Sequence, residues 1–279
     1  MKIKTLTLLL SISVLISLFS CSEKSNNQSV DNNIQFGSVK LDSIARLISD
    51  SENPVCNIKL NLEYPIEANK KALLDTLNYV FVETVFGNQY TKLSFIDASK
   101  QYVSAYIADY QQLNKEFDKD ELINSASFNY EEILEDTVYY NSNGFLCYGV
   151  KRYSYTGGAH GMSGTSCYAM ELADFRFLSC DNIFEDIYIQ NISDLIVAQI
   201  VKDRSLKTPS QLSEDGFFSV EEIAPTDNFY FNEQGITWIY NPYEIAVYAI
   251  GQIKVTLSWS SIKDYISESS PVYDFVKKL

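Results

Sequence analysis

The sequence predicts an α+β fold with a mainly antiparallel sheet, helices packed on one face, and two closely associated sub-domains. Its periodic segments run strand, helix, helix, strands, helix, strands, without the regular strand–helix alternation of parallel α/β folds. Hydrophobic residues make up 46% of the 279 positions and charged residues 21%. A chain of this length and composition can bury one large core or two smaller ones.

The first predicted elements are two strands, over residues 38–48 and 56–64. From Cys56 to Tyr64, apolar and polar side chains alternate, which is typical of a strand with one buried face. We expect Pro65 to end the second strand, because proline lacks the N–H that a sheet ladder uses.

Two amphipathic helices are predicted next, over residues 68–86 and 97–117. Apolar residues of the first recur at helical spacing, and Gly87 follows as a stop signal. In the second, Tyr102 and Tyr110 lie on one apolar stripe, which predicts a helix with one buried side.

Three strands are expected to follow, over residues 126–140, 144–155 and 164–178. The turn 141–144, with sequence Asn-Ser-Asn-Gly, joins the first two strands, and the glycine-rich segment 156–161 joins the last two. Short turns of this kind predict antiparallel neighbours.

The C-terminal part begins with a predicted helix over residues 186–203. Residues 207–227 are expected to form a loop with little regular structure, and 228–240 a hairpin. A short strand over 253–257 and a short helix over 258–266 complete the expected elements.

The N-terminus has the features of an export signal. Lys2 and Lys4 precede an apolar stretch that is too short to span a membrane comfortably, and the stretch ends before Cys21. The segment resembles a bacterial lipoprotein signal peptide over residues 1–20, with Cys21 as the lipidated residue. An uncleaved N-terminal anchor is the alternative.

These features predict the organisation of the chain. We expect a polar tether over residues 21–37, an N-terminal sub-domain over 38–180 and a C-terminal sub-domain over 181–279. The protein would then be exported and lipid-anchored to the outer membrane, facing the periplasm or the cell surface.

Charge and histidine content limit the function. The net charge is −14, so nucleic acid is not an expected partner, whereas a basic protein is compatible with this charge. The chain has one histidine, which excludes metal sites built from several histidines. Neither an EF-hand nor a phosphate loop nor a Cys-x-x-Cys pair is present, so no metal and no cofactor are predicted.

Four cysteines follow the signal segment: Cys56, Cys147, Cys167 and Cys180. In an oxidising compartment they could form two disulfides, with three possible connectivities. Cys147 and Cys167 are placed symmetrically about Gly157 and could face each other across the predicted ladder. Four buried free thiols are the equal alternative.

Two segments contain the candidate binding residues, and no catalytic set is predicted. The glycine-rich turn offers Tyr155, Gly157, Gly158, His160 and Gly161, and the segment after the hairpin offers Tyr240, Asn241, Tyr243, Glu244 and Tyr248. Both segments follow the ends of predicted strands, so they could meet in space. A purely structural turn is the alternative for each segment, and the residue types favour it.

The same two segments carry a family resemblance. Residues 153–161 (Tyr-Ser-Tyr-Thr-Gly-Gly-Ala-His-Gly) and 235–246, continued by Tyr248, Ala249 and Gly251, resemble the extracytoplasmic domains of the RsiV anti-sigma factors. Similar domains precede the catalytic domain of some peptidoglycan deacetylases. The resemblance implies a binding module that, in the RsiV branch, is a lysozyme receptor.

The expected function is therefore non-catalytic binding at the cell envelope, with lysozyme or a cell-wall glycan as the ligand. Acidic residues between positions 115 and 136 could steer a basic partner such as lysozyme. The alternative is a cell-envelope hydrolase that uses His160 with distant carboxylates. Adjacent pairs such as Glu131 and Glu132 would not serve, because neighbours on a strand point to opposite faces. A purely structural lipoprotein is a third possibility.

Overall fold

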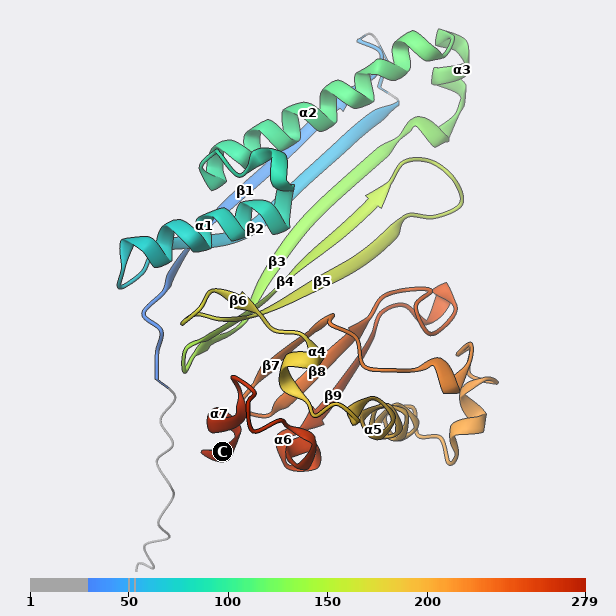
Figure 1. The fold of residues 1–279 in the computed structure, drawn as a ribbon. Coiled ribbons are helices and arrows are strands. Elements are labelled where there is room, and N and C mark those ends of the chain that lie inside the picture. Colours follow the sequence, from blue (N-terminus) through green and yellow to red (C-terminus); the bar gives the residue numbers. More distant parts are fainter. Residues whose placement is uncertain (1–29, 50, 53) are drawn as a thin grey trace, which may run out of the picture.

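The computed structural model describes residues 30–49, 51–52 and 54–279 (Figure 1). The signal segment 1–20, Cys21 and the first part of the predicted tether lie outside the described residues. The predicted α+β class is confirmed, with two mainly antiparallel sheets and helices that cover them. No helix in the described part of the chain is long and apolar enough to cross a membrane.

The larger sheet, here called the first sheet, has six strands within the described residues and the spatial order β1-β2-β3-β4-β5-β6. Its strands are β1 (Gln35–Arg46), β2 (Val55–Glu67), β3 (Tyr130–Ser142), β4 (Phe145–Tyr155), β5 (Met162–Glu171) and β6 (Arg176–Phe177). All neighbours are antiparallel except β2 and β3, which run parallel. A parallel pair needs a long crossover, and the helices between β2 and β3 supply it.

These crossover helices cover one face of the first sheet (Figure 1). They are α1 (Lys71–Phe86), α2 (Phe95–Glu116) and the short α3 (Lys119–Asn124). Helix α1 ends at Gly87, whose φ of 103° suits glycine, as the sequence predicts. Helix α2 begins after Ser94, whose hydroxyl accepts a hydrogen bond from the Asp97 N–H at 3.1 Å.

The second sheet packs against the other face of the first sheet and has its own helices beneath it (Figure 1). Its strands are β7 (Phe229–Asn232), β8 (Gly235–Tyr240) and β9 (Ile253–Ser258). The helices of this part are α4 (Cys180–Ile183), α5 (Tyr188–Asp203), α6 (Trp259–Ile262) and α7 (Tyr273–Lys277). Short 3₁₀ turns occur at Asn88–Tyr90, Ala126–Phe128, Pro209–Leu212, Val220–Glu222, Tyr248–Ile250 and Lys263–Tyr265.

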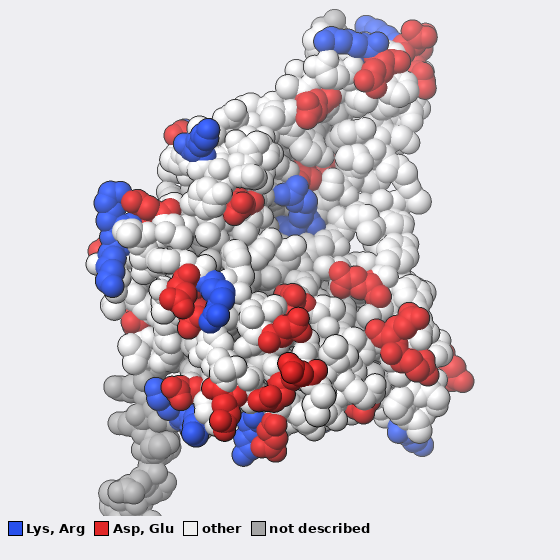
Figure 2. All heavy atoms as spheres, viewed as in Figure 1, with Lys and Arg blue, Asp and Glu red and all other residues white. Residues whose placement is uncertain are grey.

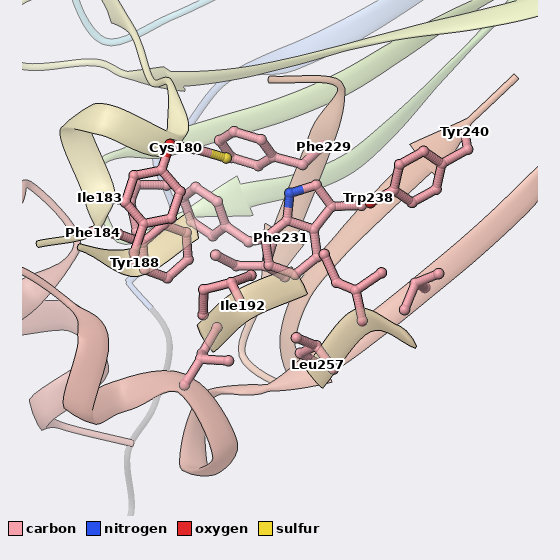
Figure 3. Close-up of a cluster of buried hydrophobic side chains, with 14 of the residues drawn as sticks. Cys180, Ile183, Phe184, Tyr188, Ile192, Phe229, Phe231, Trp238, Tyr240 and Leu257 are labelled. Atoms are coloured by element: carbon pink, nitrogen blue, oxygen red, sulfur yellow. The ribbon is translucent and has the colours of Figure 1, made fainter. Parts of the chain in front are cut away.

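The first sheet separates two hydrophobic cores, and β4 contributes to both. Leu146 and Tyr148 pack toward α1 and α2, whereas Phe145 and Cys147 pack toward the second sheet. Residues 145–150 are therefore all buried, because both faces of the strand are covered. Figure 3 shows the second core, where the indole N–H of Trp238 faces the sulfur of Cys180.

Two asparagine side chains join the second sheet to the open edge of β5. The Asn241 amide accepts a hydrogen bond from the Thr165 N–H (2.8 Å) and donates to the Thr165 carbonyl (3.2 Å). The Asn228 amide accepts from the Cys167 N–H (2.7 Å) and donates to the carbonyls of Thr165 and Ile239 (both 2.9 Å). The two amides replace a neighbouring strand, so buried backbone groups of β5 keep hydrogen-bond partners.

Several predicted boundaries are wrong for local reasons. Strand β2 continues through Pro65 to Glu67, because its ladder with β3 stops at Asn61 and no β3 partner needs the missing N–H. Residues 164–178 form two strands with a turn between them instead of one. Residues 207–227 lack long elements but are anchored by the buried Leu212 and Ile223.

All four cysteines that the structure describes are free and buried. Cys147 pairs in register with Ala169, and Gly149 with Cys167, so the two cysteines are offset by two positions and do not face each other. Burial raises the pKa of the Cys147 and Cys167 thiols to about 12. The thiols are therefore neutral and act as small apolar groups.

The amide bridge predicts the effect of removing Asn228. Asn228→Ala leaves the buried N–H of Cys167 and the carbonyl of Thr165 without this partner. We expect the free energy of unfolding to fall by about 2–3 kcal/mol in urea denaturation. The control is Asn124→Ala, since the exposed Asn124 amide donates only within its own helix, to the Asp120 carbonyl. An equal loss in both variants would contradict the bridging role.

Candidate functional site

The structure brings the two predicted segments together at one end of β5. The imidazole of His160 stacks on the Tyr248 ring, with a centroid distance of 4.0 Å and an interplanar angle of 20°. Tyr243 lies beside both, at 5.5 Å from the Tyr248 centroid and 6.5 Å from that of His160. We call these three residues the aromatic cluster.

Hydrogen bonds to backbone carbonyls fix this cluster. The Tyr248 hydroxyl donates to the Gly161 carbonyl at 2.7 Å, and Nδ1 of His160 lies 3.0 Å from the same oxygen. The Tyr155 hydroxyl donates to the Gly158 carbonyl at 3.0 Å. The glycine-rich turn is thus held at both ends before any ligand arrives, which lowers the entropy that binding would cost.

Glycine is required in this turn for two different reasons. Gly157 has a φ of 97°, and a Cβ there would meet the Ser127 carbonyl oxygen at 2.7 Å. Gly161 is buried, and its missing Cβ leaves room for the hydroxyl end of the Tyr153 side chain, which a Cβ would overlap. These contacts explain the glycines structurally.

Tyr243 is an exposed aromatic residue on a strained backbone. Its φ is 71°, which is rare for a bulky side chain, and 49% of its surface is accessible. The carboxylate of Glu244 accepts from the Asn241 backbone N–H at 2.8 Å and closes the turn. Strain of this kind persists where the surroundings enforce it, and it often marks a functional surface.

Not every predicted residue reaches the surface. Tyr240 is 1% exposed and its hydroxyl donates to the Ala224 carbonyl at 2.8 Å, so its assignment as a binding residue is wrong. It is the last residue of β8, the central strand of the second sheet, and all six residues of this strand are buried. Asn241 and Glu244 are engaged in holding the turn and β5, as described above.

A groove adjoins the chain segments that carry the aromatic cluster. It has a volume of about 550 Å³ and lies on the face of β4 and β5 that α1 covers in part. Its lining residues are Thr84, Val150, Arg152, Ser154, Met162, Ser163, Gly164, Ser166, Asn241 and Pro242. Figure 2 shows a hollow between the upper and lower halves of the molecule, with basic atoms inside it.

Arg152 is the charged residue of this groove, and buried groups orient it. Its Nη1 donates to the Tyr102 hydroxyl at 3.2 Å and lies 3.5 Å from Oε1 of Glu132, and its Nη2 donates to the Val85 carbonyl at 3.0 Å. The Tyr102 hydroxyl donates to Oε1 of Glu132 at 2.7 Å. Burial raises the pKa of Tyr102 well above its usual range, so this hydroxyl keeps its proton.

This charged triad of Arg152, Glu132 and Tyr102 was not predicted from the sequence. Glu132 and Glu131 do point to opposite faces, since Glu132 is buried under the helices and Glu131 is only half-buried. The available signal was the phase of the strand: Glu132 alternates in register with the buried Leu134. The acidic residues expected between positions 115 and 136 do not form one patch. Those from Glu116 to Glu121 lie in α3 or just before it, whereas Glu132 and Asp136 lie on the helix-covered face of β3.

Asp136 is a second carboxylate on this face. Its Oδ1 accepts the Glu63 N–H at 2.7 Å, whereas its buried Oδ2 has no hydrogen-bond partner among the described residues. Burial raises the pKa of Asp136 to about 7. Among the residues that the structure describes, no three His, Cys, Asp or Glu side chains are grouped to hold a metal ion.

Comparison with protein families finds two matches that cover successive parts of the chain. Residues 181–260 match the family described as a protein of unknown function (DUF3298). Residues 49–163, on the N-terminal side of this segment, match the family described as deacetylase PdaC. In the aromatic cluster, His160 lies in the part that matches PdaC, and both tyrosines lie in the part that matches DUF3298.

Individual relatives agree with these matches. A DUF3298 family member from Bacteroides fragilis NCTC 9343 has a crystal structure that is 29% identical, with a TM-score of 0.82 over 90% of this chain and all of that one. A DUF3298 protein from Pseudomonas aeruginosa PAO1 shares the fold at 13% identity, with a TM-score of 0.53 over 84% of this chain and 96% of that one.

The chain also resembles a curated enzyme over part of its length. Peptidoglycan-N-acetylmuramic acid deacetylase PdaC of Bacillus subtilis strain 168 is 21% identical over 195 residues. The match covers 69% of this chain and 40% of the enzyme, so the chain spans about two fifths of the length of this relative.

The close contact at Gly161 predicts a steric effect. In Gly161→Ala the new methyl group overlaps the Tyr153 ring, and the turn or the ring must shift. We expect a loss of about 1–3 kcal/mol in the free energy of unfolding, measured in urea. Gly164→Ala is the matched control, because its Cβ would meet ordinary contacts at 3.8 Å. Similar stabilities for the two variants would rule out the overlap.

The raised pKa of Asp136 predicts a pH-dependent stability. The folded pKa of about 7 exceeds the ordinary aspartate value of 3.8, so the folded state binds the proton more tightly and the free energy of unfolding decreases as pH rises from about 4 to 7. Asp136→Asn removes this term. We expect it to exceed the wild type by about 1–3 kcal/mol at pH 8 and by less at pH 5, in urea denaturation. The exposed Asp109→Asn serves as control, and a pH-independent difference for Asp136→Asn would refute the assignment.

Proposed function

We propose that this protein is a non-catalytic binding module of the cell envelope whose ligand is a cell-wall glycan. The observation that carries the proposal is the aromatic cluster of His160, Tyr243 and Tyr248, which is built from both sequence segments and fixed by backbone hydrogen bonds. Tyr243, with 49% of its surface accessible, is held at the surface on a strained backbone.

Such a cluster suits the recognition of sugars. Aromatic side chains offer a flat apolar area with a polar tip, and their few rotatable bonds make them inexpensive to immobilise. A sugar ring likewise has an apolar face and a polar rim. The neighbouring groove adds hydroxyl and amide groups that can exchange hydrogen bonds with a bound glycan.

The comparisons support a cell-wall context. Part of the chain resembles an enzyme that is named a peptidoglycan-N-acetylmuramic acid deacetylase. We propose export as a lipoprotein anchored through Cys21, with the described residues as the ligand-binding part. The N-terminal signal is the observation that supports this location.

A basic protein such as lysozyme is the second candidate ligand. It is favoured by the net charge of −14 and by the likeness of the two motif segments to RsiV extracytoplasmic domains. Figure 2 shows acidic side chains over much of the lower half of the molecule and at the tip near α3. Such a surface would accelerate encounter with a basic partner, with a strong dependence on salt.

The hydrolase alternative has weaker support. In the described part of the chain, the contacts of His160 are with the Gly161 carbonyl and the rings of Tyr243 and Tyr248. A general base needs an orienting acid and a reacting group within hydrogen-bond reach. Neither Glu132 nor Asp136 contacts His160, because both lie under the helices.

Binding of purified peptidoglycan tests the proposal. We expect the protein to co-sediment with insoluble peptidoglycan, and Tyr243→Ala to weaken this binding about tenfold because an exposed ring of the aromatic cluster is lost. Phe175→Ala is the matched control, since Phe175 is also exposed and also has a positive φ, of 54°, but lies beyond the opposite end of β5. Equal effects of both substitutions would remove the aromatic cluster from the interaction.

Lysozyme binding, measured in parallel at low and moderate salt, distinguishes the two ligands. Saturable lysozyme binding without peptidoglycan binding would replace the glycan by the second candidate. Release of soluble products from peptidoglycan that His160→Ala abolishes would instead establish the hydrolase alternative.

A further inference from the structure

We propose that the groove beside the aromatic cluster binds the carboxylate of an acidic glycan, and that Arg152 is the residue that contacts it. The inference rests on the proposed glycan-binding function and names the chemical class of the ligand. Four observations support it: the charge of the groove, the fixing of Arg152, the direction of its ion pair, and the position of the groove.

The groove differs in charge from the rest of the molecule. The chain as a whole has 36 acidic and 22 basic residues. Among the described residues that line the groove, Arg152 is the cation and none is a carboxylate; the others include four hydroxyl-bearing side chains and the Asn241 amide. A carboxylate that is repelled by most of this surface therefore meets a local site of opposite charge.

Arg152 is fixed before a ligand binds. Its contacts with the Tyr102 hydroxyl and the Val85 carbonyl hold both terminal nitrogens of the guanidinium. The Tyr102 ring also lies under the guanidinium carbon, at 5.7 Å from its centroid. A guanidinium has five N–H donors, and these contacts leave some of them free for a planar acceptor.

The ion pair of Arg152 and Glu132 presents its positive end to the groove. The Arg152 side chain is 46% exposed, whereas the Glu132 side chain is 2% exposed and receives the Tyr102 hydroxyl. Glu132 lies under the helices, on the buried side of the Arg152 guanidinium. It can therefore orient the arginine without occupying the N–H donors that face the groove. An incoming carboxylate meets charged donors that need little reorganisation, which favours a charge-assisted hydrogen bond.

The groove and the aromatic cluster share two chain segments. Met162 and Ser163 of the groove follow directly after His160 and Gly161, and Pro242 directly precedes Tyr243. A glycan of several sugar units could therefore contact the aromatic rings with one unit and place a carboxylate of the next unit at Arg152. A neutral glycan would use the aromatic cluster without the arginine.

Two soluble tetrasaccharides provide the test. One alternates N-acetylglucosamine with N-acetylmuramic acid, which carries a carboxylate, and the other is the neutral tetramer of N-acetylglucosamine. We expect the full-length protein to bind the acidic tetrasaccharide at least about tenfold more tightly in calorimetry, which corresponds to one charge-assisted hydrogen bond. Equal affinities for the two would overturn the inference while leaving the proposed function in place.

The variants identify the residue responsible. Arg152→Gln alone would strand the buried Glu132, so it is combined with Glu132→Gln, which keeps the shape of the buried side chain; together the two substitutions remove both charges. We expect this double variant to lose the preference for the acidic tetrasaccharide and to bind the neutral one as before. Lys151→Gln is the control: Lys151 is the next cation along β4, points to the opposite face and pairs with Glu135. It should leave both affinities unchanged.

Two further results would contradict the inference, and a third variant covers a failure to fold. A preference that persists in the double variant would exclude Arg152 as the carboxylate contact. If the double variant fails to fold, Arg152→Lys keeps the charge but loses the planar fork, and we expect a smaller preference for the acidic tetrasaccharide. If neither tetrasaccharide nor insoluble peptidoglycan binds to the wild type, both the inference and the proposed function are wrong.

Discussion

The architecture depends on the two asparagine amides that occupy the open edge of β5. Asn228 and Asn241 supply both donors and acceptors to a strand that would otherwise present unpaired backbone groups to the interior. They join the second sheet to the first along one line of hydrogen bonds. Because Asn241 also begins the turn that carries Tyr243, the same contact that holds the two halves together places the aromatic cluster against the glycine-rich turn and closes one side of the groove.

Much of this fold follows from local patterns. The alternation in β2 and the helical spacing in α1 and α2 predict those elements because each buries a single face. The parallel pairing of β2 with β3 was not predicted, since strand direction is set by the packing of the crossover helices and not by either strand. Pro65 shows the same limit: whether a missing N–H matters depends on where the neighbouring strand stops.

The site divides in a similar way. The two motif segments could be found because glycine-rich and Asn-Pro turns are visible in sequence, and their common position at strand ends suggested that they meet. Tyr240 was misassigned because a strand-end tyrosine looks the same whether its hydroxyl meets solvent or the Ala224 carbonyl. The Arg152–Glu132–Tyr102 triad has no local signature beyond the buried strand phase of Glu132, since its three members come from β4, β3 and α2 and meet only when those elements pack.

The residue after Asn241 has a consequence for chemical ageing. Asparagine deamidates when the following backbone nitrogen attacks its side-chain amide, and Pro242 has no N–H with which to form that ring. Conversion of Asn241 to aspartate would replace the donor that faces the Thr165 carbonyl by a negatively charged acceptor. The proline therefore protects the Asn241 side chain, which must remain an amide to keep its place at the junction between the two halves.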